Sequence, residues 1–333
     1  MPGNDRERKR REYAESLIPS PSDAPNLAAR LGEANYARRL RLEAEREAEF
    51  HAILSTKFTW MKVHLLRPSE RMILKCIGLW RLGRRGYFDL KVVENEVRLG
   101  EKLPKSFDGF RIAHLTDLHI DMDDALVPLL AKALEETDYD LCVMTGDYRN
   151  LTVGGIARTV ELMQRLAPSL KAPAYLVPGN HDFLAEVPPM ERTGKYRFLL
   201  NESVRISRTD GDGALWLCGV DDPAVFRTHD IGRASAGIDS GGVRVLLAHS
   251  PRVYRAAESA GFDLLLAGHT HGGQVCLPGG RAVMNNDATP RAYQKGAWRH
   301  GKMIGYTSCG CGATGLPIRI NCPPEIAVHV LRR

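Results

Sequence analysis

Short apolar runs separated by amphipathic stretches make up the chain from residue 107 onward. Three of the amphipathic stretches are typical of helices: Asp124–Glu136, Gly154–Leu166 and Pro251–Ala260. The apolar runs have the length and composition of buried strands: Phe110–Leu115, Leu141–Thr145, Ala174–Val177, Ala214–Val220, Val243–Ala248, Phe262–Ala267, Met303–Ser308 and Ile326–Leu331. Alternation of this kind predicts a layered α/β domain.

The first third of the chain has a different pattern. Residues 1–28 are rich in charge, Pro and Ser, and this composition predicts a disordered basic tail. From Leu27 to Thr56 the pattern predicts a charged helix with a thin apolar stripe. Pro68 interrupts the following segment and predicts two short helices there. We therefore expect a tail at 1–28, a helical, basic amphipathic extension at 29–103, and a catalytic domain at 104–333.

The positive charge is concentrated in that first third. The whole chain has a net charge of +6, whereas residues 1–105 hold 22 Lys and Arg against 15 Asp and Glu. Within it, the basic arm, residues 57–86, interleaves eight basic residues and one acid with Trp60, Trp80 and aliphatic side chains. This mixture favours an interfacial helix on an anionic membrane. A helix packed on the catalytic domain, or a solvated charged face, fits the same pattern.

Cysteine usage and hydropathy indicate the compartment. The seven cysteines are an odd number, are widely spaced and include no CxxC pair, which favours a reducing environment. No run of about 18 apolar residues occurs, and the charged start lacks the core of a signal peptide. We expect a cytoplasmic protein that lies peripherally on the inner membrane through the basic arm.

Polar clusters follow five of the predicted strands. Ligands of open α/β sheets bind at the carboxyl ends of strands, where these clusters lie. Buried His and Asp side chains need partners, and metal ions supply them. Mixed carboxylate, imidazole and amide ligands suit Mn, Fe or Zn, and a bridging carboxylate such as Asp147 can join two ions that hold a hydroxide for in-line attack on a phosphoryl group. The clusters are Asp117-Leu118-His119, Gly146-Asp147, Gly179-Asn180-His181-Asp182, His249 and Gly268-His269-Thr270-His271.

These motifs, in this order, are similar to those of the calcineurin-like metallophosphoesterases over residues 104–331. GHTHGGQV at 268–275 and GLPIRINCPPEI at 315–326 resemble a bacterial subfamily of membrane-associated phosphodiesterases and UDP-2,3-diacylglucosamine hydrolase relatives. The resemblance implies a four-layer αββα sandwich with an N-terminal helical extension. It also implies two divalent transition-metal ions and hydrolysis of a phosphodiester or pyrophosphate bond, with a lipid-linked substrate such as UDP-2,3-diacylglucosamine as one option.

The resemblance also assigns roles to single residues. His181 is the acid that protonates the leaving oxygen or stabilises charge in the transition state. Asp147 bridges the two ions. The remaining ligands divide into Asp117, His119 and His271 for the first metal, and Asn180, His249 and His269 for the second.

One position departs from the family pattern. Many relatives have an Asp three residues after the bridging Asp, where it orients the catalytic His, but this chain has Asn150. An Asn carbonyl can hold the imidazole without adding negative charge, and Asp182 is the alternative orienting group. Arg149, directly after Tyr148, is a candidate for binding a substrate phosphate, with a surface salt bridge as the plainer reading.

Other features of the sequence bear on alternative functions. The glycines of Gly310–Gly315 fit GxGxxG, but no helix follows, so a tight turn beside the metals is favoured over dinucleotide binding. A nuclease or cyclic-nucleotide phosphodiesterase of the same superfamily is the alternative enzyme. Residues 107–333 are slightly acidic, which disfavours nucleic acid as a partner. The complete ligand set disfavours a non-catalytic metal-binding scaffold, although motifs do not identify the group attached to the phosphate.

Overall fold

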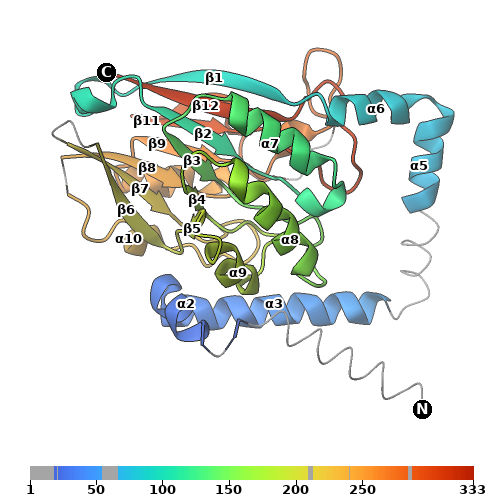
Figure 1. The fold of residues 1–333 in the computed structure, drawn as a ribbon, viewed down its shortest axis with the longest axis horizontal. Helices are drawn as coiled ribbons and strands as arrows, with labels where there is room; N and C mark the ends of the chain where they lie inside the picture. Colours follow the sequence, from blue (N-terminus) through green and yellow to red (C-terminus); the bar gives the residue numbers. More distant parts are fainter. Residues whose placement is uncertain (1–18, 21, 55–66, 209–212, 240, 284–286) are drawn as a thin grey trace.

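The computed structural model describes residues 19–20, 22–54, 67–208, 213–239, 241–283 and 287–333. It contains two six-stranded sheets that lie face to face (Figure 1). In spatial order, the first is β1 (Lys91–Arg98), β12 (Glu325–Arg332), β2 (Arg111–Leu115), β3 (Leu141–Met144), β4 (Ala174–Leu176) and β5 (Tyr196–Phe198). The second is β10 (Gly296–His300), β11 (Met303–Thr307), β9 (Leu264–Ala267), β8 (Val243–Leu247), β7 (Ala214–Gly219) and β6 (Glu202–Ser207).

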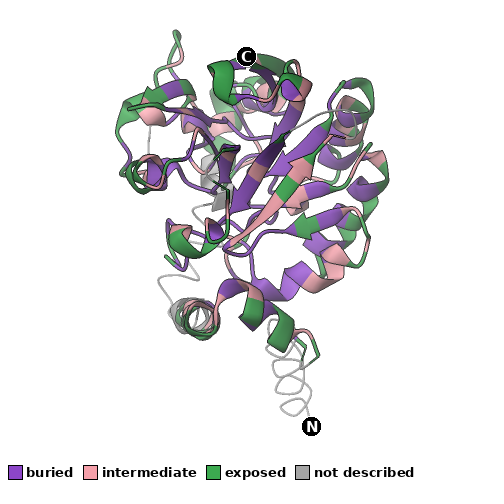
Figure 2. Cartoon of the chain, turned by 90° about the vertical axis from the view of Figure 1, so that its left-hand side faces the viewer, coloured by how far each residue is buried: buried purple, intermediate pink, exposed green. Residues whose placement is uncertain are grey.

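Helices cover the outer face of each sheet. The first sheet packs against α7 (Leu126–Glu136), α8 (Ala157–Leu166) and α9 (Val187–Glu191) in one apolar core. The second packs against α10 (Ile231–Ala234) and α11 (Tyr254–Ser259) in another. A third core lies between the sheets, and Figure 2 shows the inner strands as mostly buried. The four-layer αββα arrangement expected from the family resemblance is confirmed.

The eight apolar runs predicted as strands all form strands, because each is buried on both faces or nearly so. β2, β3, β4 and β5 pair in parallel, as do β7, β8 and β9. The carboxyl ends of neighbouring parallel strands lie at the same edge of a sheet. The loops that carry the polar clusters are therefore brought together at one end of the sandwich.

The helical extension expected at 29–103 is wrong at its end, because Lys91–Arg98 form the edge strand β1. This strand pairs in parallel with β12 over eight residues. Val92 is 48% exposed and Val93 is 36% exposed, so the segment offers little of the burial signal that marks a strand in a sequence. Backbone hydrogen bonds to the buried strand β12, rather than burial of side chains, hold β1 in the sheet.

Two helices precede the catalytic domain and pack against it. The predicted charged helix is present as two helices, α2 (Ala24–Leu31) and α3 (Glu33–Leu54), with a break at Gly32, where φ is 92°. Leu27 and Leu31 are buried in the core below the first sheet, so the tail predicted as disordered up to residue 28 ends before Ala24. Residues 1–18 and 21 lie outside the described part of the chain. Figure 1 shows α2 and α3 beneath α8 and α9.

The basic arm is described from residue 67 onward, and residues 57–66 lie outside the description. The described part of the arm forms two short helices, α5 (Arg67–Cys76) and α6 (Leu79–Tyr87), and not one long helix. These two helices meet at Gly78, where φ is 75°, whereas Pro68, the residue predicted to break the segment, lies within α5. No helix among the described residues is long and apolar enough to cross a bilayer.

Candidate metal centre

The predicted ligands converge where the loops after five strands meet. The loops follow β2, β3, β4, β8 and β9. Five of the ligands have a left-handed backbone, which is uncommon for residues with a Cβ and costs about 1–3 kcal/mol at each position. Strain of this kind clusters at functional sites, where it aims side chains that a regular backbone would point elsewhere. The five are Asp117 (φ 50°), His119 (φ 40°), Asp147 (φ 56°), His269 (φ 72°) and His271 (φ 52°).

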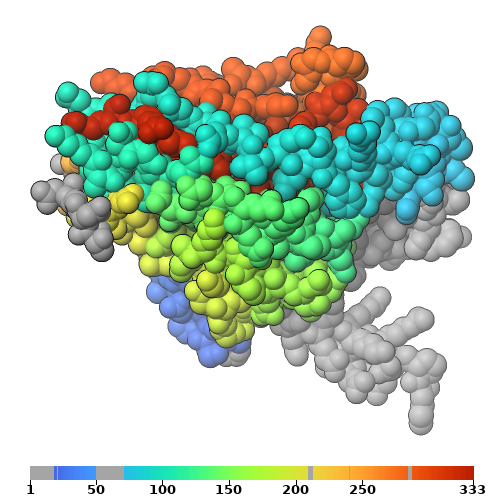
Figure 3. All heavy atoms as spheres, turned by 45° about the horizontal axis from the view of Figure 1, so that its top comes forward, coloured from blue at the N-terminus to red at the C-terminus, as the bar shows by residue number. Residues whose placement is uncertain are grey.

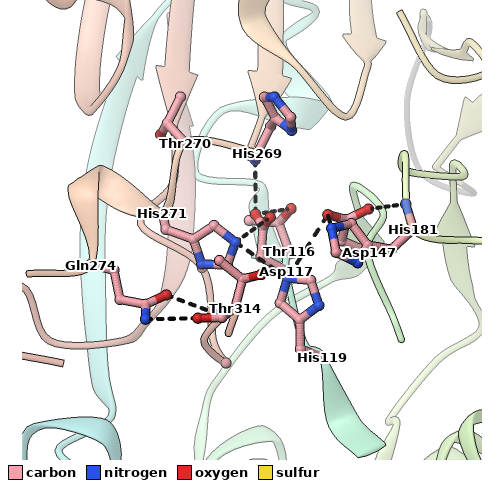
Figure 4. Close-up of polar contacts among 12 residues, drawn as sticks. Thr116, Asp117, His119, Asp147, His181, His269, Thr270, His271, Gln274 and Thr314 are labelled. Carbon is pink, nitrogen blue, oxygen red and sulfur yellow. Dashed lines mark hydrogen bonds and ion pairs between the residues drawn. The ribbon is translucent and has the colours of Figure 1, made fainter. Parts of the chain in front are cut away.

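Asp117, His119 and His271 form the first donor group (Figure 4). His271 Nε2 lies 3.2 Å from Asp117 Oδ1 and 3.2 Å from His119 Nε2. Two ligands about 2.0–2.2 Å from one ion lie roughly 3.0–3.5 Å apart, so this spacing suits a shared cation. Asp117 Oδ1 is buried and accepts no hydrogen bond from the described residues. A buried carboxylate oxygen without a donor is costly, and a metal ion would satisfy it.

The second donor group contains Asp147, His249 and His269, with Asn180 beside them. His249 Nε2 lies 3.2 Å from Asp147 Oδ2, 3.1 Å from Asn180 Oδ1 and 3.2 Å from His269 Nδ1. These four side chains therefore present two oxygens and two nitrogens around one point. The mixture of carboxylate, amide and imidazole fits Mn, Fe or Zn, as expected from the sequence.

Asp147 lies between the two groups. Its Oδ2 is 3.2 Å from His249 Nε2 in the second group and 3.8 Å from His119 Nε2 in the first. Its Oδ1 accepts a 2.8 Å hydrogen bond from the backbone N–H of His181. One carboxylate oxygen thus faces both groups while the other is fixed by the main chain, which is the placement expected of a bridging ligand.

The backbone selects which nitrogen of each imidazole faces the centre. His119 Nδ1 lies 2.7 Å from the carbonyl oxygen of Arg149, and His249 Nδ1 lies 2.7 Å from that of Thr145. A carbonyl only accepts, so each Nδ1 carries the proton and donates it. The Nε2 lone pair of a neutral ring is then directed at the donor group, as metal binding requires.

The carboxylates of the site also favour a positive charge between them. Burial lowers the pKa of His119 to about 4 and lowers the pKa of His271 well below its ordinary value, so both rings are neutral. Burial also lowers the pKa of His249, but the carboxylate of Asp147 outweighs it and raises the pKa to about 10. The carboxylates of the centre thus favour a positive charge at this position, which a bound cation would supply. The residues present fit a metal centre.

His181 lies at the solvent side of this centre, with its side chain 16% exposed. Its Nε2 is 3.7 Å from Asp147 Oδ2, and its Nδ1 donates to the backbone carbonyl of Asn150 at 2.6 Å. The ring is therefore held with Nε2 toward the place where a leaving group would be. The expected orienting contact from the side chain of Asn150 is wrong, because the main chain of that residue makes it.

Asp182 does not orient His181 either. Both of its oxygens accept backbone N–H groups: those of Asp147 at 2.8 Å, Tyr148 at 2.9 Å and Gly179 at 2.6 Å. The carboxylate thereby ties the loop after β3 to the loop after β4. The sequence prediction of a catalytic role is replaced by a structural one, because the hydrogen bonds of Asp182 go to backbone N–H groups and none goes to the imidazole of His181.

Arg149 is buried in the loop after β3. It is 1% exposed, and its guanidinium donates to the carbonyls of Val153 at 2.9 Å and Gly154 at 2.6 Å. The group also lies 4.6 Å above the ring of Phe183. Arg149 braces the loop after β3 through these contacts, and its contact with a substrate phosphate stays a prediction.

Two further residues support the centre and were missed by the sequence analysis. Asp287 Oδ2 lies 3.3 Å from His269 Nε2, on the side of the ring opposite the donor group, and 3.0 Å from Arg252 Nε. Arg319 is fully buried and donates to the carbonyls of Cys309, Gly312 and other residues around the His271 loop. Asp287 follows no strand or motif, whereas Arg319 lies within the GLPIRINCPPEI segment that the resemblance had marked.

The glycines of Gly310–Gly315 form the tight turn that the sequence predicted. Gly310 has a φ of 82°, and a Cβ there would lie 2.8 Å from Asp117 Cβ. A Cβ on Gly312 would lie 2.0 Å from the carbonyl oxygen of Leu118. Gln274 joins this turn to the His271 loop through hydrogen bonds of 3.0 and 2.9 Å with the backbone of Thr314 (Figure 4). The turn can approach the first donor group only because Gly310 and Gly312 have no side chains.

Comparisons with known proteins agree with this geometry. Residues 110–273 match the model of a family described as calcineurin-like phosphoesterase. The uncharacterized metallophosphoesterase YkoQ of Bacillus subtilis is 28% identical over 250 residues, covering 72% of this chain and 90% of that protein. An uncharacterized metallophosphoesterase of Aquifex aeolicus is 29% identical over 245 residues, covering 70% and 88%. A Danio rerio protein named transmembrane protein with metallophosphoesterase domain is 28% identical over 259 residues, covering 73% and 57%.

Proposed function

This chain belongs to the calcineurin-like metallophosphoesterase family and is a phosphoesterase; from that premise we propose that it cleaves phosphodiester or pyrophosphate bonds with two divalent transition-metal ions. The position of Asp147 Oδ2 between the two donor groups carries the proposal. One ion needs four to six ligands, whereas seven predicted ligands surround this centre: two groups of three His and Asp donors, with Asn180 beside the second.

Each residue has a role that follows from its contacts. Asp117, His119 and His271 would hold one ion, Asn180, His249 and His269 would hold the other, and Asp147 would bind both. The two ions supply an activated water and neutralise charge on the phosphoryl group when bound. The carbonyl of Asn150 accepts from Nδ1 of His181 and fixes its ring, so only the doubly protonated ring carries a proton at Nε2, and this form would donate that proton to the leaving oxygen.

We further propose that the substrate is a phosphate ester at an anionic membrane surface, with a lipid-linked pyrophosphate such as UDP-2,3-diacylglucosamine as the first compound to test. Support comes from α5 and α6, which project at one end of the molecule (Figure 3). Four aliphatic side chains there are more than half exposed: Met72 at 63%, Ile73 at 58%, Ile77 at 60% and Leu82 at 53%.

Exposed basic residues flank these aliphatic side chains: Arg71, Lys75, Arg81 and Arg85. Apolar groups enter the interface of a bilayer while lysine and arginine remain at the headgroups. Gly83 and Gly86 of α6 pack against Ile318 and Arg319, so this surface is attached to the segment that braces the His271 loop. A lipid substrate bound there would be close to the metal centre.

The proposed reaction is tested by turnover and metal content together. Purified protein loaded with manganese is assayed with bis(p-nitrophenyl) phosphate, p-nitrophenyl phosphate, cyclic nucleotides and a UDP-diacyl sugar, and its metals are counted by elemental analysis. We expect close to two ions per chain and hydrolysis of diesters or pyrophosphates, with both lost in Asp147→Ala. Full activity with a single ion would contradict the dinuclear centre, and a two-ion protein that hydrolyses none of these compounds would contradict the proposed substrates.

A further inference from the structure

Helix α3 lies across the loop that carries Asn180 and His181. Its residues meet that loop at successive turns: Arg39 donates to the carbonyl of Asp182 at 2.6 Å, and Glu43 accepts from the N–H of Leu184 at 3.1 Å. Arg46 donates to the carbonyl of Asn180 at 2.6 Å. These contacts place a segment that precedes the catalytic domain directly beside the metal centre.

Arg39 fixes the position of α3. Its side chain is fully buried, pairs with Asp221 at 2.9 Å and with Glu43 at 2.8 Å, and lies 3.5 Å above the ring of Phe226. Breaking a buried, hydrogen-bonded pair is strongly unfavourable, so the helix cannot slide along its axis. Positions i and i+7 share a face of a helix, and Arg46 therefore points toward the domain as Arg39 does.

Arg46 has bonding capacity that the described part of the protein does not use. Its single hydrogen bond goes to the Asn180 carbonyl, and it forms no ion pair with a carboxylate among the described residues. The side chain is half-buried. The carboxylates of Asp147 and Asp222 attract the guanidinium through space. The positive charge of Arg46 in turn opposes protonation of the His181 ring. A partly desolvated guanidinium with free N–H groups is suited to bind an anion.

We propose that Arg46 is a substrate-binding residue, whose guanidinium donates to a non-bridging phosphate oxygen on the His181 side of the metal centre. The inference rests on the proposed function for the identity of the anion as a phosphate ester. One N–H group of Arg46 donates to the Asn180 carbonyl and another is directed to the phosphate. The planar guanidinium is therefore oriented before the substrate binds. The N-terminal helix thereby completes a binding site that the catalytic domain alone lacks.

The test compares Arg46→Ala and Arg46→Lys with Arg41→Ala in the manganese-loaded full chain. Arg41 is a matched control, because it lies on the same helix with its side chain 68% exposed. A hydrogen bond to a charged group contributes enough for its loss to raise KM by about tenfold to a hundredfold in Arg46→Ala. We expect calorimetry to show a similar loss of affinity for inorganic phosphate, two ions retained, partial recovery in Arg46→Lys and no effect of Arg41→Ala.

Two results would overturn this role. Unchanged KM and phosphate affinity in Arg46→Ala would show that the guanidinium does not touch the substrate. Loss of a metal ion together with kcat would show that Arg46 only positions Asn180. Failure of the proposed function gives a different result. The wild-type protein would then hydrolyse none of the substrates, while its affinity for phosphate would still depend on Arg46. That result would refute the proposed substrates and retain the binding site.

Discussion

Backbone carbonyl groups, rather than carboxylates, orient three of the imidazoles in the site. His119, His181 and His249 each donate from Nδ1 to a main-chain oxygen at 2.6–2.7 Å. A carbonyl fixes the tautomer without adding the full negative charge that a carboxylate would place beside the ring. The acceptors are the main-chain oxygens of Arg149, Asn150 and Thr145.

Asn150 tests this arrangement at a single position. We predict that Asn150→Ala keeps kcat within about threefold of the wild type and leaves the acidic limb of the pH–rate profile in place, because the main chain makes the bond to His181. Profiles of kcat and kcat/KM measured on both proteins decide the question. A hundredfold loss or a displaced limb would mean that the Asn150 side chain engages His181 once substrate is bound.

His181 itself is expected to serve turnover and not metal binding. His181→Ala should slow kcat by roughly 10²–10⁴ and leave two ions bound, because the ring donates a proton to the leaving group. Elemental analysis and single-turnover rates on the same preparation separate the two effects. Since His181 Nε2 lies 3.7 Å from Asp147 Oδ2, loss of an ion in this variant would reassign the ring as a ligand.

At the scale of secondary-structure elements, burial decided what the sequence could predict. The inner strands are buried throughout or nearly so and read as continuous apolar runs, as β3 and β9 do. The edge strands β1, β6 and β10 are exposed or only partly buried at most positions and carry no such signal. The metal ligands follow inner strands and were predictable, whereas Asp287 and Arg46 reach the site through contacts between segments distant in sequence, which no local pattern records.

The β2–β12 pair contains two buried histidines outside the metal centre. His329 Nε2 lies 3.3 Å from His114 Nδ1, and the outer nitrogens bond to Asn95 and Thr145. Burial lowers the pKa of His329 to about 3 and, together with the neighbouring ring, lowers the pKa of His114 well below its ordinary value. Both rings are therefore neutral in the folded protein at pH values where the unfolded chain protonates them.

This pair makes stability depend on pH with a definite sign. The unfolded chain binds protons below about pH 6.5 that the folded protein does not, so the stability is present above that pH and is lost as the pH falls. Each ring should remove about 2 kcal/mol from the unfolding free energy between pH 8 and pH 5. Urea unfolding at both pH values, with a chelator present, measures this change in the free energy of unfolding. We expect the cost of His329→Gln to be about 2 kcal/mol smaller at pH 5 than at pH 8, and an equal cost at both would contradict the neutral pair.

For the whole molecule, the N-terminal region is part of the fold and not an appendage. Helix α2 contributes Leu27 and Leu31 to the core, α3 spans the catalytic loop, and β1 completes a sheet. Cutting the chain near Leu103 would remove all three elements together with the basic arm. The membrane role of the arm therefore has to be tested by substitutions on α5 and α6 in the full-length protein.

Binding of the full-length protein to vesicles is the last prediction. Basic residues near an anionic leaflet contribute about 1 kcal/mol each before screening, and buried aliphatic side chains add a term that salt weakens little. Wild-type protein should therefore float with anionic vesicles and remain at the bottom of the gradient with neutral ones. Exchanging Ile73, Ile77 and Leu82 for Ser should abolish flotation, while Val92→Ser and Val225→Ser, each at a residue 48% exposed elsewhere on the surface, should not. Equal flotation of all variants would mean that α5 and α6 do not form the membrane contact, since these exposed side chains make no difference to it.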